Sequence, residues 1–236
     1  MKIVIFGAGG HGRVVLDVVH AQRQHEVAGF LDSDAALKGR RIDGLPVLGG
    51  AELLPRLKHD GIAGAIVAIG DNGVRRSLHD AIHKSGLTLV NAVHPSAQIA
   101  ASARMGRNVV VAAGVVVSAH CQIGDSVILN TGCIVDHESM IGTAAHICPG
   151  VRLAGHVTIE SGAFVGIGAT VIQNIRIGFD AVVGAGAVVI RDVAPMSTVV
   201  GMPAREIKCA PSAAQFATLL HPRYDLRDPM HAAVIY

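Results

Sequence analysis

Aliphatic side chains, or Met, recur every six residues through the middle of the chain. An α-helix repeats every 3.6 residues and a strand every 2, so neither produces a strict period of six. A chain that turns a corner every six residues does, and three such sides close a triangular coil of 18 residues. The pattern therefore predicts a parallel β-helix of hexapeptide repeats. The recurring residues are Ile99, Met105, Val111, Val117, Ile123, Leu129, Val135, Ile141, Ile147, Leu153, Ile159, Val165, Val171, Ile177, Val183 and Val189.

Strand and helix patterns alternate in the first 94 residues. Buried strands are predicted at residues 2–6, 27–31, 64–69 and 88–92, and helices after residue 10, at 51–58 and at 74–85, with a charged loop from 32 to 50. This alternation indicates a small Rossmann-like parallel sheet with its ligand edge at the carboxyl ends of the strands. We expect an α/β domain at residues 1–94, the all-β helix at 95–203 and a C-terminal segment of unassigned role at 204–236.

Composition narrows the class of protein. Half of the residues are hydrophobic but only 3% are aromatic and none is Trp, so the core must consist of Val, Ile, Leu and Ala. A net charge of +2 gives no reason to expect nucleic acid or an anionic membrane as a partner. The longest apolar stretch is too short to span a bilayer, and the N-terminus lacks a signal-peptide pattern. Four unevenly spaced cysteines predict no disulfide framework, so we expect a reduced, cytoplasmic protein.

A glycine-rich motif, GAGGHG, occupies residues 7–12 between a predicted strand and helix, with Asp32 twenty residues further on. Glycines there let the backbone approach a phosphate, which the helix N-terminus favours. A full NAD-binding fold uses six strands and about four are predicted here, so we expect nucleotide binding without a nicotinamide half. The alternative is a turn that serves only strand–helix packing. His11 weighs against it, because such a turn needs no imidazole.

His137 and Glu138 are the second candidate site. Glu138 occupies a turn position where other coils use Gly, Asn, Asp or Ser, and such departures are expected at functional sites. Residues 18 apart stack one strand spacing apart, so His137 is expected between Ala119 and Gly155 with open space around its ring. A His beside a carboxylate is the unit of general base catalysis. A surface His without a role is the alternative, since the chain has thirteen histidines.

Histidines near this site also raise the question of zinc. The four concerned are His120, His137, His146 and His156, and β-helix carbonic anhydrases use three His and zinc on the same prism. No pair here has the short His-x4-His spacing that such a site resembles, and the Glu beside His137 suits a base better than a ligand. We therefore expect no metal.

Six segments together resemble one family. In chain order they read GAGGHGRVVLDVV, GFLDSD, AIGDNGVRR, VNAVHPSA, ILNTGCIVDHESMIG and VVGMPA. Their order is similar to that of the NeuD/PglD-type sugar acyltransferases, and the resemblance covers about residues 1–208. It implies a left-handed β-helix, a homotrimer with active sites between neighbouring β-helices, and acetyl-CoA as co-substrate.

The resemblance also implies roles for individual residues. His137 matches the family's general base and Glu138 its acidic partner, where many relatives have Asp. Gly155 would offer its N–H to the oxyanion, a contribution worth about 3 kcal/mol in other acyl transferases. The implied substrate-binding residues are Gly7, Gly9, Gly10, His11, Gly12, Asp32, Gly70, Asp71, Asn72 and Asn130. Those implied for acetyl-CoA are His146, Gly155, Gly166, Ile167, Ala185 and Pro203.

The leading hypothesis is an N-acetyltransferase for a nucleotide-linked 4-amino-4,6-dideoxy sugar of surface glycan synthesis, with UDP preferred and GDP possible. O-acetylation of sialic acid or another sugar is the alternative within the enzyme class. A nucleotide-sugar-binding scaffold is the alternative outside the enzyme class, and a dehydrogenase is a third option. Aliphatic outward positions are consistent with burial against neighbouring subunits: Val110, Val116, Ile128 and Ile134.

Overall fold

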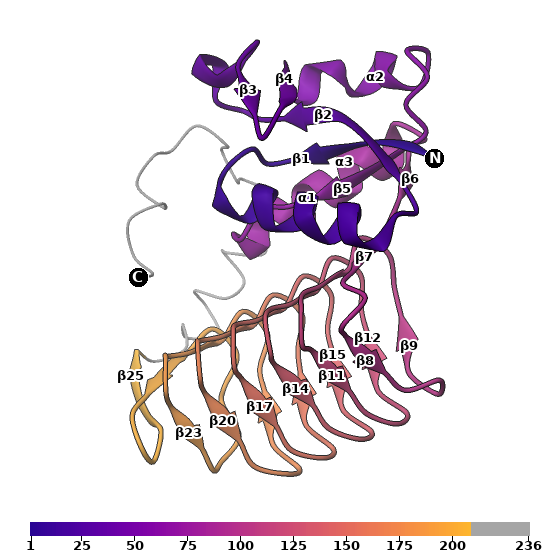
Figure 1. Cartoon of the computed structure of the whole chain (residues 1–236). Coiled ribbons are helices and arrows are strands. Elements are labelled where there is room, and N and C mark those ends of the chain that lie inside the picture. Colours follow the sequence, from indigo (N-terminus) through magenta and orange to yellow (C-terminus); the bar gives the residue numbers. More distant parts are fainter. Residues whose placement is uncertain (209–236) are drawn as a thin grey trace.

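The computed structural model describes residues 1–208, which form an N-terminal α/β domain seated on a triangular β-helix (Figure 1). The α/β domain has a six-stranded sheet in the order β3-β4-β2-β1-β5-β6. All neighbours are parallel except β3 and β4, which pair antiparallel. The strands are β1 (Lys2–Phe6), β2 (Glu26–Leu31), β3 (Arg41–Ile42), β4 (Leu45–Gly49), β5 (Gly64–Val67) and β6 (Thr88–Leu89).

Alternating side chains of β1 divide this domain into two apolar layers. Ile3 and Ile5 lie in one cluster with helix α1 (Gly10–Gln22), whereas Val4 and Phe6 lie in the other. The second cluster includes residues of α2 (Leu54–Leu57) and α3 (Asn72–Lys84). The period of two in a buried strand therefore sets which helices cover which face. Two short 3-10 turns, η1 (Ala35–Leu37) and η2 (Ala51–Leu53), complete the domain.

The sheet has more strands than the sequence predicts. Residues 33–50 were expected to form a loop, but β3 and β4 lie there, and β4 pairs parallel with β2. The count is therefore six strands and not about four, although β3 and β6 have only two residues each. Pro46, Gly49 and the charged residues before β4 hide its apolar pattern. The predicted strand at 88–92 is also divided, between β6 and the first strand of the β-helix.

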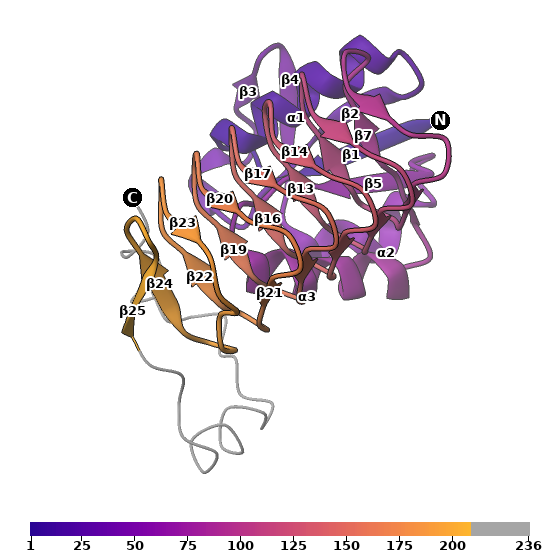
Figure 2. The same ribbon diagram turned by 90° about the horizontal axis from the view of Figure 1, so that it is seen from below.

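Short parallel strands stacked one coil apart form three sheets, which confirms the predicted β-helix, and its coils are left-handed. Figure 2 shows the coils from below as a regular staircase. The domain-facing sheet contains β7 (Ala92–Val93), β10 (Val110–Val111), β13 (Ile128–Leu129), β16 (His146–Ile147), β19 (Phe164–Val165), β22 (Val182–Val183), β24 (Thr198–Val200) and the antiparallel β25 (Arg205–Lys208). The second sheet contains β8 (Gln98–Ile99), β11 (Val116–Val117), β14 (Ile134–Val135), β17 (Arg152–Leu153), β20 (Thr170–Val171) and β23 (Val188–Val189). The third contains β9 (Arg104–Met105), β12 (Gln122–Ile123), β15 (Met140–Ile141), β18 (Thr158–Ile159) and β21 (Arg176–Ile177).

The three corners of the prism are called the loop corner, the base corner and the helix corner. The loop corner joins the domain-facing and second sheets, the base corner joins the second and third, and the helix corner joins the third and domain-facing sheets. The second residue of each strand points inward, as the period predicts; Val111, Leu129 and Ile147 are fully buried. The first coil strand starts at Ala92, slightly before the predicted domain boundary, and β25 falls within the predicted C-terminal segment. The rest of that segment, 209–236, lies outside the described residues.

Helix α1 is held between the α/β sheet and the β-helix. Its Val18 and Val19 share one buried cluster with Val110 and Ile128 of the domain-facing sheet. The chain's own N-terminal domain therefore covers these two outward residues, and the expectation that a neighbouring subunit buries them is wrong for this pair. Val116 and Ile134, on the second sheet, remain partly exposed.

Helix α3 docks along the helix corner, one coil after another. Seven residues of helix rise about 10.5 Å, close to the roughly 9.6 Å of two coils, so successive turns of α3 meet successive coils. The contacts are His79 Nδ1 to Ser126 Oγ (2.8 Å), Arg75 Nη2 to Ala144 O (2.7 Å), Asn72 Nδ2 to Gly162 O (2.8 Å) and Arg76 Nη2 to Asp180 Oδ1 (3.1 Å). The four coil residues are spaced 18 apart, which is one column of the β-helix.

Arg75 is the central group of this junction and is fully buried. Each of its five N–H groups has an acceptor within 2.9 Å: Ser126 O, Ile69 O, Gly70 O, Asn72 Oδ1 and Ala144 O. Burial lowers the pKa of the guanidinium to about 9. Four of the acceptors are carbonyls of two domains, so Arg75 fixes how the domains sit together.

Replacing Arg75 with Met should lower the free energy of unfolding by roughly 3 kcal/mol, because the buried carbonyls would lose their donors. Arg76→Met is the matched control on the same helix. Its ion pair with Asp180 is partly exposed and should be worth at most about 1 kcal/mol. Urea unfolding of the three proteins measures the difference, and equal losses for both variants would contradict the assigned role of Arg75.

Candidate active site

The turns of the base corner bring His137, Glu138 and His156 together. Glu138 adopts a φ of 58° and His156, one coil above, a φ of 57°. In other turns of the β-helix the left-handed position holds Gly, Asn, Ser or Asp, but also Ala144, His120 and Met196, so the predicted restriction to Gly, Asn, Asp or Ser is wrong. A turn in this conformation directs the residue outward, so both side chains stand about half exposed on the surface.

One carboxylate oxygen of Glu138 meets both imidazoles. His137 Nδ1 lies 3.1 Å from Glu138 Oε2, and His156 Nε2 lies 3.0 Å from the same oxygen. The two rings are edge to face, with centroids 5.3 Å apart. With Nδ1 bearing the proton that faces Glu138, His137 Nε2 keeps its lone pair and is available as a base.

The ring of His137 lies directly on Gly155. A Cβ at position 155 would come within 2.6 Å of both Cε1 and Nε2 of the ring, so only glycine fits there. The open space predicted around the ring therefore exists only because residue 155 has no side chain. Within residues 1–208 the N–H of Gly155 donates no hydrogen bond, whereas that of His137 donates to Asp136 Oδ1 (2.7 Å).

Within the described residues, the side chains of His137, Glu138 and His156 form the one group whose ligand atoms are close enough together to hold a metal ion. Ligand atoms of His137, Glu138 and His156 lie within 4.8 Å of one another. The search for His-x4-His pairs missed this grouping, because those histidines are five residues apart, whereas the coil brings together residues 18 or 19 apart. Distances of 3.0–3.1 Å to a shared oxygen are those of hydrogen bonds. His146, also considered for zinc, lies in β16 on a different sheet.

The glycine motif forms the turn from β1 into α1. A Cβ on Gly7 would approach Ala68 O to 2.6 Å and one on Gly12 would strike Gly7 O, so these two glycines serve the turn and helix packing. Gly9 and Gly10 have nothing within 4 Å of that position. Gly9 is the N-cap without a side-chain cap, and the first turn of α1 holds no acidic residue. The exposed glycines and the uncapped N–H groups are therefore free for an anion.

Four of the predicted substrate-binding side chains have hydrogen bonds within the protein, and one of them is Asn130, whose Oδ1 accepts from Thr131 N–H (2.8 Å). Asp32 Oδ2 accepts from the N–H of Ala8 (2.8 Å) and so holds the glycine turn. Asp71 is the N-cap of α3, and its Oδ1 accepts from Val74 N–H (2.7 Å). Asn72 donates to Gly162 O across the domain junction. Gly70, in contrast, has open space where a side chain would be.

His11 and His146 face each other across the junction, with ring centroids 6.4 Å apart. His11 Nε2 and His146 Nδ1 are buried without a hydrogen-bond partner in the described chain. Burial, helped by the nearby charge of Arg75, lowers the pKa of His11 to about 4 and that of His146 to about 3. Asn130 Nδ2 lies 3.4 Å from His146 Nε2. Two neutral imidazoles with unused polar atoms thus lie together, although His11 was predicted to bind the nucleotide sugar and His146 was predicted to bind acetyl-CoA.

Four of the six predicted acetyl-CoA residues lie at the loop corner, namely Gly166, Ile167, Ala185 and Pro203, whereas His146 lies in β16 and Gly155 at the base corner. Ile167 and Ala185 form one column with 18-residue spacing, and Ile167 is 58% exposed. Pro203 falls outside this column, because the last coil is two residues shorter and pairs Val182 with Thr198. Position 166 has no room for a side chain, since a Cβ on Gly166 would come within 2.7 Å of Ala185 N. Within one chain, this column and His137 lie on two different corners of the prism, with the second sheet between them. The chain therefore brings the predicted site residues together in two groups.

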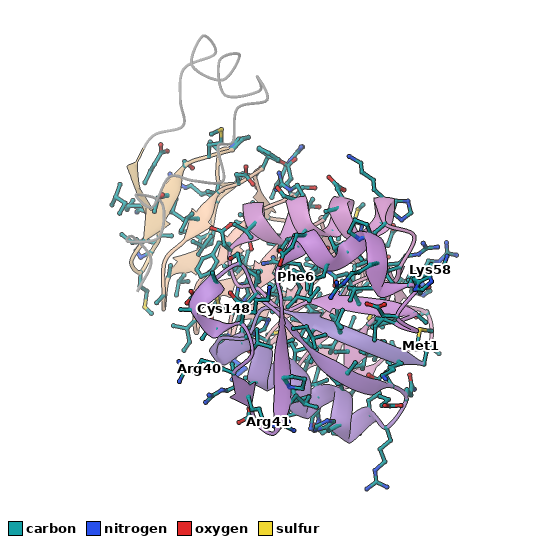
Figure 3. All side chains as sticks on the ribbon, turned by 90° about the horizontal axis from the view of Figure 1, so that it is seen from above. Met1, Phe6, Arg40, Arg41, Lys58 and Cys148 are labelled. Atoms are coloured by element: carbon teal, nitrogen blue, oxygen red, sulfur yellow. The ribbon has the colours of Figure 1, made fainter. Side chains whose placement is uncertain are left out.

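Two features of the site were missed from the sequence. His156 was weighed only as a possible zinc ligand, although its 18-residue spacing from Glu138 was the signal that places it on the next coil. Arg75 was not singled out, because a basic residue on a predicted helix gives no sign of being buried. Arg40 and Arg41, in the predicted charged loop, are exposed, and Figure 3 shows them at the periphery of the N-terminal domain. No helix within residues 1–208 is long and apolar enough to cross a membrane.

Comparisons with known proteins agree with this geometry. The PglD N-terminal domain family matches residues 2–82. The structure of PerB from Caulobacter crescentus, in complex with CoA and GDP-perosamine, is 42% identical, covering 87% of this chain and 97% of that chain with a TM-score of 0.83. The acetyltransferase domain of PglB from Neisseria gonorrhoeae, in complex with acetyl coenzyme A, is 34% identical, covering 87% and 98% with a TM-score of 0.82.

A curated relative is UDP-N-acetylbacillosamine N-acetyltransferase from Bacillus subtilis (strain 168). It is 35% identical over 115 residues, which are 48% of this chain. The match spans about half of that relative's length (51%).

The low pKa values of His11 and His146 predict a loss of stability in mild acid. An unfolded histidine takes up its proton near pH 6.5, whereas these two do so only at about pH 4 and 3. Between pH 6.5 and 4 the unfolded chain binds more protons, so the free energy of unfolding falls as the pH falls. We expect roughly 2 kcal/mol per histidine between pH 6.5 and 5.

Urea unfolding at pH 7 and pH 5 measures this loss. His146→Gln should show a smaller loss than wild type, because one of the two buried titrating groups is gone. His59→Gln is the control, since the His59 side chain is 96% exposed. An identical pH dependence in wild type and His146→Gln would refute the prediction.

Proposed function

Because the chain belongs to the NeuD/PglD-type family of sugar acyltransferases, we propose that it transfers the acetyl group of acetyl-CoA to the C4 amine of a nucleotide-linked 4-amino-4,6-dideoxy sugar. The observation that carries this proposal is the hydrogen-bonded His137–Glu138 pair, stacked on Gly155, whose N–H has no acceptor within residues 1–208. Relatives named as a perosamine N-acetyltransferase and a UDP-N-acetylbacillosamine N-acetyltransferase support an amino sugar as acceptor.

His137 is the general base in this mechanism. Its Nε2 takes a proton from the neutral sugar amine as the nitrogen attacks the thioester carbonyl. Glu138 holds the Nδ1 proton and stabilises the imidazolium that forms. The Gly155 N–H donates to the oxygen of the tetrahedral intermediate. Collapse breaks the C–S bond and releases CoA, whose sulfur accepts the proton from the His137 imidazolium.

The N-terminal domain holds the nucleotide in this proposal. Gly9, Gly10 and the uncapped start of α1 receive the diphosphate, whose charge the helix N-terminus favours. His11 and His146 are neutral near pH 7 and bring unused polar atoms to the sugar side of the junction. Asp32 acts by holding the glycine turn, since its Oδ2 accepts from the N–H of Ala8 and its Oδ1 accepts from the N–H of Asp34.

Acetyl-CoA lies along the loop corner beside Gly166, Ile167 and Ala185. Because that corner and His137 are on opposite sides of the second sheet, a complete site requires a neighbouring protomer. A homotrimer in which the loop corner of one chain faces the base corner of the next provides this arrangement. The partly exposed Val116 and Ile134 of the second sheet suit such a contact.

The assay compares acceptor sugars that are carried by different nucleotides. The sequence interpretation prefers UDP, whereas the similarity that extends over more of the chain is to a protein whose structure holds GDP-perosamine. We therefore expect turnover with a 4-amino-4,6-dideoxy sugar carried by one of these two nucleotides.

Thiol release from acetyl-CoA, measured with GDP-perosamine, a UDP-linked 4-amino sugar and free sialic acid, tests the function. His137→Ala should lower kcat by about 10²–10⁴-fold, as expected for loss of a general base. His120→Ala is the control, an exposed histidine on the coil below Glu138. Activity on sialic acid alone would replace N-transfer by O-transfer. Binding of a nucleotide sugar without any turnover would favour a scaffold.

Chelation should leave this activity unchanged, because the proposed proton transfer uses no ion. Excess zinc should inhibit it, since an ion held by His137, Glu138 and His156 would occupy the lone pair that deprotonates the amine. Both are measured by the same thiol assay, with EDTA restoring the zinc-treated enzyme. A permanent loss of turnover after EDTA alone would contradict a metal-free mechanism.

A further inference from the structure

The turns of the β-helix differ in whether a backbone hydrogen bond closes them. In many of them the N–H of the fourth turn residue donates to the carbonyl of the first, as from Cys133 to Asn130 O (3.1 Å), from Ala145 to Gly142 O (3.2 Å) and, at the base corner, from Ala103 to Ala100 O (2.9 Å). Within the described residues, the base-corner turns 136–139 and 154–157 make no such bond. Another group must therefore fix their peptides.

Ser139 takes this role for the turn that contains Gly155. Its hydroxyl accepts the N–H of Val157 (3.1 Å) and donates to Ala154 O (3.2 Å). The N–H of Val157 occupies the acceptor side of the hydroxyl, so the hydroxyl proton is directed at Ala154. Ser139 is fully buried, and this contact therefore lies inside the coil.

The carbonyl of Ala154 and the N–H of Gly155 belong to one peptide unit. In a trans peptide these two groups point in opposite directions. Holding the carbonyl inward on Ser139 therefore turns the Gly155 N–H outward, towards the side where His137 lies. A rotated peptide would lose the bond to Ser139 and withdraw the N–H.

The coil below also has a buried side-chain donor that points at a turn carbonyl. Cys121, one coil under Ser139, directs its thiol at Asp136 O (3.1 Å), which belongs to the same peptide as the His137 N–H. The inward position of this corner carries a hydrogen-bond donor in these two coils alone; its occupants are Ala103, Cys121, Ser139, Val157 and Ile175. Donors thus lie beneath the peptides that precede His137 and Gly155, and of these two peptides the proposed mechanism uses the N–H of Gly155.

We propose that Ser139 is a positioning residue for acyl transfer, which orients the Ala154–Gly155 peptide so that its N–H meets the oxyanion. The inference rests on the proposed function, because it assigns a task to the N–H of Gly155. Ser139 touches no substrate and acts only through the peptide that it holds.

Ser139→Ala should lower kcat about tenfold with both KM values within twofold of wild type, since a whole oxyanion donor is worth 10²–10³ and only its orientation is lost. The pH profile should keep its shape, because His137 and Glu138 are untouched. Ser139→Cys should recover most of the activity, as a thiol makes the equivalent contact at Cys121.

Ser126→Ala is the matched control. Ser126 is also fully buried, and its hydroxyl contacts Asn108 and His79 at 2.8 Å each, at the helix corner. Alanine is tolerated in this turn, since Ala144 occupies the same position one coil above. We expect Ser126→Ala to lose stability in urea and to keep kcat.

Two results would overturn the proposal. The first is an active wild type whose kcat survives Ser139→Ala, or falls no further than the folded fraction of the variant. The second does not depend on turnover: a crystal structure of Ser139→Ala in which the Ala154 carbonyl keeps its inward direction. A wild type that acetylates no amino sugar would instead refute the proposed function, and the crystal structure would still test whether Ser139 holds the peptide.

Discussion

Closure of the coils after 18 residues, which holds for all but the last, is the constraint on which the rest of the structure depends. It stacks side chains of equal position about 4.8 Å apart, so each residue is selected together with the residues above and below it in its column. Glu138 reaches His156 because they are 18 apart, and Gly155 lies on the coil above His137, against its ring, for the same reason. A rigid backbone ladder thus sets the geometry of the base corner, as preorganised catalysis requires.

The same register receives the N-terminal domain. Helix α3 has a rise that nearly matches the coil spacing, and its polar side chains therefore find an acceptor on each successive coil. Arg75 makes this fit specific, since each of its N–H groups is used and four of its acceptors are backbone carbonyls from both domains. The position of the domain in turn buries His11 and His146, which explains why both imidazoles are neutral near pH 7.

Much of the fold and part of the site could be predicted. The period of six located the coils, and the strand–glycine–helix pattern located the α1 turn, because both are local signals repeated or confirmed within a few residues. β4 was missed because its apolar residues are interrupted by Pro46 and Gly49, and its pairing with β2 is decided by the sheet. Asp71 and Asn72 were predicted to meet ligand, yet a carboxylate or amide near a strand end can serve a helix cap or a domain contact equally well.

The sequence by itself determined the prism, its 18-residue columns and the pairing of His137 with Glu138, since these depend on spacing along the chain. Only the tertiary structure decided how the two domains sit together, and with that the burial of Arg75, His11 and His146. It also decided that His137 and the predicted acetyl-CoA column lie on different corners of the prism. The physical reason is that spacing within a repeat is a property of the chain, whereas burial and the facing of groups far apart in sequence arise only when separate surfaces pack.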